Sequence, residues 1–247
     1  MHTINIETPS GWQYLNDHQL RFVFHLLATD HSAEQVKTLF LLKLGKIHVI
    51  SRIGAAFLCK RGKARFTLSA LQIAECLSHL GWLDGIPAYP VRLSKIRGHI
   101  ALPADLQTVP FSTYIMLDNL YQGYLHTQNN DLLVRMAILL YNASDDFMLS
   151  EEERISVFYW FASVKKYFAR TFSHFFLPQE VNAEGAPSGN IGQQLQEAMN
   201  AQIRALTGGD ITKEKEVLAM DCWRALTELN AKAKDYEDMK KSSKSIS

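Results

Sequence analysis

The stretch from Leu149 to Leu177, LSEEERISVFYWFASVKKYFARTFSHFFL, constrains the fold more than any other part of the chain. Ser150 followed three residues later by Glu153 is the capping-box signature of a helix N-terminus, so the sequence predicts a helix that starts here. At about 1.5 Å per residue this helix would be about 40 Å long. Its large apolar side chains spread around most of the circumference: Ile155, Val157, Phe158, Trp160, Phe161, Val164, Tyr167, Phe168, Phe172, Phe175 and Phe176. A helix that is apolar on nearly all sides must be covered on nearly all sides.

Two arrangements would cover such a helix. In the first, it is the central helix of an all-helical core. In the second, part of its cover comes from another subunit, because a large apolar surface rarely faces water. The second arrangement predicts a protein interface made of these rings and of apolar residues near the C-terminus: Phe158, Trp160, Phe161, Tyr167, Phe168, Phe172, Leu218, Trp223 and Leu229.

Composition narrows the class of protein. With 47% hydrophobic and 21% charged residues, the chain of 247 residues is typical of an ordinary globular protein. A net charge of +1 argues against a globally basic nucleic-acid coat. Three cysteines at wide spacing favour reduced thiols over a disulfide framework. The first residues lack the pattern of a signal peptide, and no apolar run approaches the ~20 residues of a membrane span, so we expect a cytoplasmic protein without a membrane segment.

Helical periodicity dominates the chain, so we predict a mainly α fold: a multi-helix globular domain with a small β-hairpin insertion and a C-terminal helical hairpin arm. The helical core domain is predicted to span residues 1–177. Residues 178–190, PQEVNAEGAPSGN, have the composition of a linker. A C-terminal pair of helices, each with one narrow apolar stripe, is expected at 191–240, and a disordered tail at 241–247.

Three helices with recognisable N-caps are predicted in the first third of the chain. They are HQLRFVFHLLA after Asn16 or Asp17, AEQVKTLFLLKLG after Ser32, and ALQIAECLSHLGWL after Ser69. The last has the length of a helix from a DNA-binding helix-turn-helix. However, the segment GIPAYPVRL, with its two prolines, follows it in place of a partner helix.

A basic β-hairpin is predicted between Ile47 and Leu68, where the helical period gives way to alternation. The segments AFLCK and ARFTL read as strands around a turn at Arg61 and Gly62. Between Gln35 and Ala74 there is no Asp or Glu, whereas Lys and Arg contribute eight positive charges. A candidate basic patch consists of Lys60, Arg61, Lys63 and Arg65. Such a hairpin could lie against phosphates or an acidic partner, or it could be a solvated tip without a ligand.

Catalytic and metal-binding motifs are not evident. The chain has no G-x-S-x-G elbow, glycine-rich phosphate loop, H-E-x-x-H or C-x-x-C. Two groups could be drawn as metal ligands, Glu75 with Cys76 and His79, and the cluster within residues 25–34, but neither has a second ligand group at a recognised spacing. The acidic residues between Asp145 and Glu153 are better explained by a turn and a helix N-terminus than by a paired-carboxylate site. We therefore predict no enzymatic activity, no cofactor and no metal site.

The C-terminal stretch QLQEAMNAQIRALTGGDITKEKEVLAMDCWRALTELNAKAKDYEDM resembles the end of a group of small helical proteins encoded in bacteriophage and prophage structural operons. In that group a helix, a Gly-Gly-Asp turn and an x-x-L-x-M-D-x-W-x-A-L-x-E-L-N helix close the chain. The blocks FSTYIMLDNLYQGYLHT and FYWFASVKKYFARTFSHFF are similar in texture to the group, so the resemblance covers mainly residues 110–240. The basic hairpin has no match in it.

The resemblance implies a virion-morphogenesis protein related to tail assembly: a chaperone that shields the tape-measure protein, or a neck or connector component. The implied partners are other virion or tail proteins, or a second copy of the chain, in the host cytoplasm or the assembled virion. Our first hypothesis is accordingly a non-enzymatic structural or assembly protein that acts through protein–protein contacts. The alternative is a nucleic-acid-binding protein that uses the acid-free basic segment 35–74.

Overall fold

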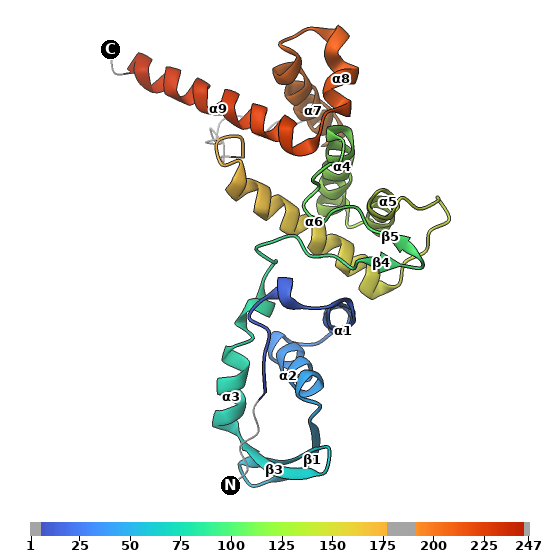
Figure 1. Ribbon diagram of the computed structural model, residues 1–247, viewed down its shortest axis with the longest axis vertical. Coiled ribbons are helices and arrows are strands. Elements are labelled where there is room, and N and C mark those ends of the chain that lie inside the picture. Colours follow the sequence, from blue (N-terminus) through green and yellow to red (C-terminus); the bar gives the residue numbers. More distant parts are fainter. Residues whose placement is uncertain (1–5, 177–190, 245–247) are drawn as a thin grey trace.

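A computed structural model describes residues 6–176 and 191–244 of this mainly α-helical protein (Figure 1). The helices are α1 (Asp17–Leu27), α2 (Ala33–Gly45), α3 (Ala70–Ser78), α4 (Phe111–Thr127), α5 (Asn130–Tyr141), α6 (Glu151–Thr171), α7 (Ile191–Thr207), α8 (Glu214–Ala219) and α9 (Cys222–Lys244). The strands are β1 (His48–Ile53), β2 (Ala56–Arg61), β3 (Ala64–Ser69), β4 (Lys95–Ile96) and β5 (His99–Ile100). Single turns of 3-10 helix are η1 (Trp12–Tyr14), η2 (Gly81–Asp84) and η3 (Ile211–Lys213).

Helix α6 begins where the sequence predicts, at a complete capping box. The Glu153 amide donates to the Ser150 hydroxyl, and the Ser150 amide donates to the Glu153 carboxylate at 3.0 Å. The same carboxylate accepts a hydrogen bond from Arg21 of α1 at 3.1 Å. One side chain therefore both starts α6 and fixes α1 against it.

The apolar circumference of α6 is covered by other helices of the same chain. Helices α1, α4 and α5 pack against it, and Trp160, Phe161 and Phe168 are completely buried. The Trp160 indole N–H donates to the Ala104 carbonyl at 2.8 Å, so its polar atom is satisfied inside the core. The ring of Tyr121 in α4 lies 5.3 Å from that of Phe161. Of the two arrangements open from the sequence, the structure has the first, a central helix of an intrachain core.

Helix α6 ends earlier than the sequence predicts, at Thr171. Phe172 leaves helical geometry with φ −115° and ψ 54°. The two amides of the following turn, those of His174 and Phe175, donate to the side-chain oxygen of Asn230 in α9 at 3.0 and 3.2 Å. A residue distant in sequence thus helps to terminate the helix, which local sequence cannot reveal.

The second helix of the predicted C-terminal pair is broken into η3, α8 and α9. At the break, Met220 is extended, and its carbonyl accepts from the Phe111 amide at 2.8 Å. The Cys222 amide donates to the Val109 carbonyl at 2.8 Å. These two bonds pair the break with Val109 and with Phe111, the first residue of α4. The C-terminal arm is therefore joined to the body by backbone hydrogen bonds.

Asp221 makes this junction specific. One carboxylate oxygen accepts from the Thr108 amide at 2.8 Å, and the other accepts from the Arg224 amide at 3.0 Å in the first turn of α9. Helices α7, α8 and α9 all pack on α4, while the C-terminal part of α9 extends away from the body (Figure 1). The predicted linker 178–190 lies outside the described residues. Of the predicted disordered tail, residues 241–244 belong to α9 and residues 245–247 lie outside the described chain.

The predicted β-hairpin is part of a three-stranded antiparallel sheet, in the order β1-β2-β3. Strands β2 and β3 form the expected hairpin, and β1 adds a third strand, paired from His48 opposite Lys60 to Ile53 opposite Ala56. A bulge between Val49 and Ser51 interrupts the alternation of β1. Gly62 has φ +59°, which suits the first position of a two-residue hairpin loop.

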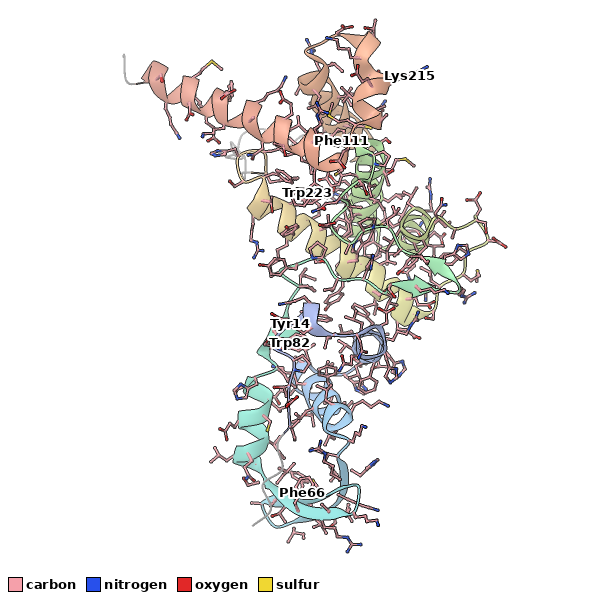
Figure 2. All side chains as sticks on the ribbon, in the orientation of Figure 1. Tyr14, Phe66, Trp82, Phe111, Lys215 and Trp223 are labelled. Carbon is pink, nitrogen blue, oxygen red and sulfur yellow. The ribbon has the colours of Figure 1, made fainter. Side chains whose placement is uncertain are left out.

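We refer to residues 33–80, which comprise α2, the three-stranded sheet and α3, as the sheet lobe. It lies at the opposite end of the molecule from α7 and α8 (Figure 1). A chain of rings attaches it to α6: Phe40 contacts Trp82 at 6.1 Å, Trp82 contacts Trp12 at 5.7 Å, and Trp12 contacts Tyr159 at 5.6 Å. Figure 2 shows Trp82 at this junction and Phe66 in the sheet beyond it.

Candidate interaction surface

The residues predicted as a protein interface pack on other parts of the same chain. Trp223 of α9 lies between α9 and α6 (Figure 2), with its ring 5.4 Å from Phe172 and 5.9 Å from Phe168. Its indole N–H donates to the Asp105 carbonyl at 2.8 Å. Five of the predicted residues are buried: Trp160, Phe161, Phe168, Phe172 and Leu229. Part of the predicted interface is thus a seam between α6 and α9. Trp160 and Phe161 lie elsewhere on α6, where they contact Ala104 and Tyr121.

The remaining four predicted residues are half-buried and also have partners within the chain. Phe158 packs on Tyr121 at 5.8 Å and on Tyr124 at 5.6 Å. Tyr167 contacts Trp223 at 5.9 Å, and Leu218 and Trp223 pack against the core. These contacts account for the apolar character of α6 without a second subunit.

The predicted basic patch lies at the tip of the β2–β3 hairpin, where all four side chains are exposed: Lys60, Arg61, Lys63 and Arg65. Lys60 and Arg65 stand directly opposite one another in the register, and His48 of β1 stands opposite Lys60. Paired residues of an antiparallel sheet share a face, so these three side chains lie on one face. The neighbouring Cys59 points to the other face and is completely buried, whereas Lys60 and Arg65 on this basic face are exposed to solvent.

The sheet lobe has a strong local charge. From Glu34 to Glu75 the chain has eight positive and two negative side chains, a net charge of +6, whereas the whole chain has +1. The rest of the chain therefore carries −5. Lys37 is paired with Asp84 at 2.6 Å. Like charges placed opposite each other, as at Lys60 and Arg65, destabilise a sheet slightly, and an anion bound there would relieve that repulsion.

An open groove of about 670 Å³ lies beside this sheet, between α1 and α2. We refer to it as the α1–α2 groove. Its lining residues are Asn16, His18, Gln19, Phe22, Leu39, Phe40, Leu42, Lys43, Leu44, Lys46, Ile47 and His48. Half of them are apolar, and none of these described lining residues is acidic. His48 belongs both to the groove and to the basic face, so the two surfaces are continuous.

Two lysines of the groove are held by identifiable contacts. The Lys43 ammonium lies 5.3 Å from the centroid of the Phe22 ring, a cation–π distance. Lys46 is the C-cap of α2 in the left-handed region, with φ 50° and ψ 42°, and its amide donates to carbonyls of the last turn of α2. Both side chains are exposed. The groove thus combines an apolar floor with cations at its edge.

The sequence predictions did not identify this groove. Leu39 lines the groove, and 36% of its surface is exposed. The signal was present in the run VKTLFLLKL of α2, which is apolar on nearly all sides, as α6 is. Additional apolar side chains of the lobe are exposed on β1 and α3: Val49, Ile50, Ile53 and Leu71.

The acidic residues near the start of α6 have structural roles. The Ser144 hydroxyl donates to the Asp146 carboxylate and lowers its pKa. Arg154 pairs with Glu151, and Glu153 belongs to the capping box. These contacts are those of a turn and a helix N-terminus, as the sequence indicated.

The titratable groups of the core are inert. Burial raises the pKa of the Cys222 thiol and that of the Tyr114 hydroxyl, so both stay protonated near neutral pH. Within residues 6–176 and 191–244, no group of three or more His, Cys, Asp or Glu side chains is placed to hold a metal ion. In the described part of the chain, no helix is both long enough and apolar enough to cross a membrane.

Comparison of the chain with known protein families, with curated protein sequences and with solved structures finds no significant match.

Proposed function

We propose that this protein is a non-enzymatic binding protein that acts through contacts with other proteins, and that it makes these contacts with the sheet lobe. The observation that carries the proposal is the α1–α2 groove, an open apolar surface that continues into the basic face of the sheet. Exposed apolar surface next to a concentrated charge of one sign is a common property of protein-binding sites.

The chemistry of the groove favours binding over catalysis. Its described lining contains leucines, isoleucine, phenylalanines, lysines, histidines and amides, and it lacks a nucleophile next to a base. Of the described residues, the buried rings of α6 are engaged with α1, α4 and α9, so they are not the contact surface that we propose.

The resemblance of residues 110–240 to bacteriophage and prophage morphogenesis proteins provides the context of the proposal. In that context the partners are virion or tail proteins, and the protein acts in tail assembly or as a neck or connector component. The sheet lobe, which lies outside the region of resemblance, would then bind and select the partner. The helical body would be the scaffold to which the sheet lobe is attached.

A second candidate function is nucleic-acid binding by the acid-free segment 35–74. It is favoured by one specific observation, the placement of His48, Lys60 and Arg65 on one solvent face. Phosphate binding by such a face would weaken steeply as the salt concentration rises, because counterions are released on binding. The basic side chains on the sheet could bind the phosphate backbone of a nucleic acid. The adjacent groove, which is mainly aliphatic, does not suit phosphates.

Site-specific photo-cross-linking tests the proposed function. A photoreactive phenylalanine analogue is placed at Leu39 or Ile50 in the sheet lobe and, as matched controls, at the exposed Met116 of α4 or Ile211 of η3. The experiment is done in cells that express the protein together with the products of its neighbouring genes, so that its natural partners are present. We expect protein adducts from the two lobe positions and few from the controls. Adducts confined to the controls, or none at all, would contradict the proposal, and nuclease-sensitive adducts would support the second candidate.

A further inference from the structure

We infer that the α1–α2 groove binds an amphipathic segment of a partner protein, with apolar side chains that enter the groove and carboxylates on either side of them. This inference rests on the proposed function and specifies the chemistry of the partner. It is independent of which virion or cellular protein supplies the segment.

The floor of the groove requires apolar side chains. Leu39, Leu42 and Leu44 project from α2, and Phe22 of α1 and Ile47 complete the apolar part of the lining. A volume of about 670 Å³ falls within the range of about 300 to 1,000 Å³ typical of binding pockets. The groove lies between two helices and opens to solvent, a setting in which a partner helix can lay apolar residues at i, i+3, i+4 and i+7 against it.

The edge of the groove requires negative charge. Lys43 and Lys46 line it, together with His18 and His48, and its described lining contains no carboxylate. An acidic flank on the partner would be attracted, whereas a basic flank would be repelled by the same groups. Since the segment between Glu34 and Glu75 has no internal acid, this preference extends over the whole lobe.

The groove continues into the basic face of the sheet, so the partner segment should extend beyond the part that enters the groove. His48 lines the groove and shares the sheet face with Lys60 and Arg65. A segment that leaves the groove at His48 therefore meets cations again at the hairpin. We expect further acidic residues on the partner beyond the part that enters the groove.

Aliphatic side chains distinguish this ligand from nucleic acid. Bases stack on exposed aromatic rings, and phosphates are held by cationic and polar groups. In the groove, Phe40 is almost fully buried and Phe22 is half-buried under Lys43, so its open surface is mainly aliphatic. The apolar side chains of a protein segment match that surface better.

A displayed library of helical peptides tests the inference. Each peptide has fixed leucines at the groove-facing spacing and Glu, Lys or Ser at the flanking positions. The library is selected on the full-length protein alone, without counter-selection on any variant. We expect enrichment of Glu at the flanks, and an enriched peptide should bind in fluorescence anisotropy with an affinity that falls as salt rises.

Three variants locate the binding of the enriched peptide. Leu39→Asp and the double variant Lys43→Glu/Lys46→Glu should each weaken it by about tenfold or more. Leu71→Asp is the matched control, because Leu71 is 79% exposed on α3 and does not line the groove, so binding should be unchanged. Circular dichroism and thermal melting verify that each variant is folded.

Lys46→Gly separates binding from folding. Glycine adopts the left-handed conformation of this position without strain, so the melting temperature should not fall, while affinity for the acidic peptide should drop. A loss of affinity in a protein at least as stable as the wild type would assign the effect to the lost charge.

Other outcomes would overturn the inference. Selection of peptides with basic or uncharged flanks would reject an acidic ligand, and so would peptide binding that tolerates Leu39→Asp. If no peptide is selected and the fatty acid oleate saturates the groove, the ligand is a lipid and not a peptide. Self-association that Lys43→Glu/Lys46→Glu abolishes, again with no peptide selected, would assign the groove to a second copy of the chain. If cross-links from Leu39 and Ile50 persist while the groove variants have no effect on peptide binding, the proposed function stands and the groove assignment fails.

Discussion

Helices α6 and α2 have the same kind of apolar sequence, but the fold covers α6 more completely than α2. Both are apolar on nearly all sides, and both begin at a complete capping box. Helix α6 lies at the centre of the body, where α1, α4, α5 and α9 bury its rings. Helix α2 lies in the sheet lobe, and part of its surface forms the open α1–α2 groove.

The difference teaches that an apolar circumference indicates a need for cover and does not indicate its source. The chain supplies the cover of α6 from segments far away in sequence, such as Trp223 and Asn230 in α9. The smaller sheet lobe has fewer helices to place around α2, so Leu39 remains partly exposed. The candidate interface therefore lies on the shorter and less aromatic of the two helices.

The largest expected difference between the two helices concerns removal of a side chain. Trp160→Ala in α6 deletes a fully buried ring and its hydrogen bond to Ala104, and it should lower the free energy of unfolding by about 3 to 5 kcal/mol. Leu39→Ala in α2 should lower it by about 1 kcal/mol or less, because that side chain is partly exposed. Urea denaturation followed by circular dichroism gives both values. Equal losses at the two positions would show that α2 is covered as completely as α6.

The next effect tests whether α9 really completes the cover of α6. Asn230→Ala leaves the His174 amide without its acceptor, whereas the Phe175 amide keeps its bond to the Phe172 carbonyl at 3.1 Å. The substitution should lower the free energy of unfolding by about 1 to 2 kcal/mol. Lys234→Ala, at an exposed position of α9, is the matched control and should change it by about 0.5 kcal/mol or less. A loss at Asn230 no greater than the control's would mean that α9 is not docked at the end of α6.

The two capping boxes permit a direct comparison. Ser150→Ala removes the cap of α6 and Ser32→Ala that of α2, and each should lower the stability of its own region by about 1 kcal/mol. The consequences should differ in extent. Hydrogen exchange should show opening throughout the body in the first variant and opening limited to the sheet lobe in the second. Opening of α6 by the Ser32 variant would contradict the separation of the two regions.

The smallest predicted effect has the opposite sign. Lys46→Gly relieves the left-handed backbone of a non-glycine residue, so it should raise the free energy of unfolding by about 1 kcal/mol or less. Thermal denaturation of the Lys46→Gly variant is compared with that of Lys43→Gly. Lys43 lies at a helical position of α2, where glycine should destabilise the helix. Destabilisation by both substitutions would remove the backbone argument at Lys46.

Local features of the sequence predicted much of the fold. The caps at Asn16, Ser32, Ser69 and Ser150 mark the starts of α1, α2, α3 and α6, because capping depends on residues three positions apart. The β2–β3 hairpin was predicted for a similar reason, from a glycine turn between alternating segments.

Features that depend on distant residues escaped prediction. The break between α8 and α9 arises because Asp221 and its neighbours pair with residues 108–111, far earlier in the chain. The early end of α6 depends on Asn230. The alternation after Ile47 indicated an extended segment, but its pairing with β2 as a third strand was not predicted. The groove could not be located from the sequence, because the sequence does not show which apolar face of α2 remains uncovered by the rest of the chain.

The most direct test of this account is hydrogen exchange of the purified full-length protein at two protein concentrations, about a hundredfold apart. We predict that the most slowly exchanging amides of α6 open with the free energy of global unfolding at both concentrations, because α6 is covered by its own chain. Amides of the sheet lobe should exchange faster than these. If α6 instead exchanges faster at the lower concentration, its cover comes from a second subunit, and the assignment of binding to the sheet lobe is wrong.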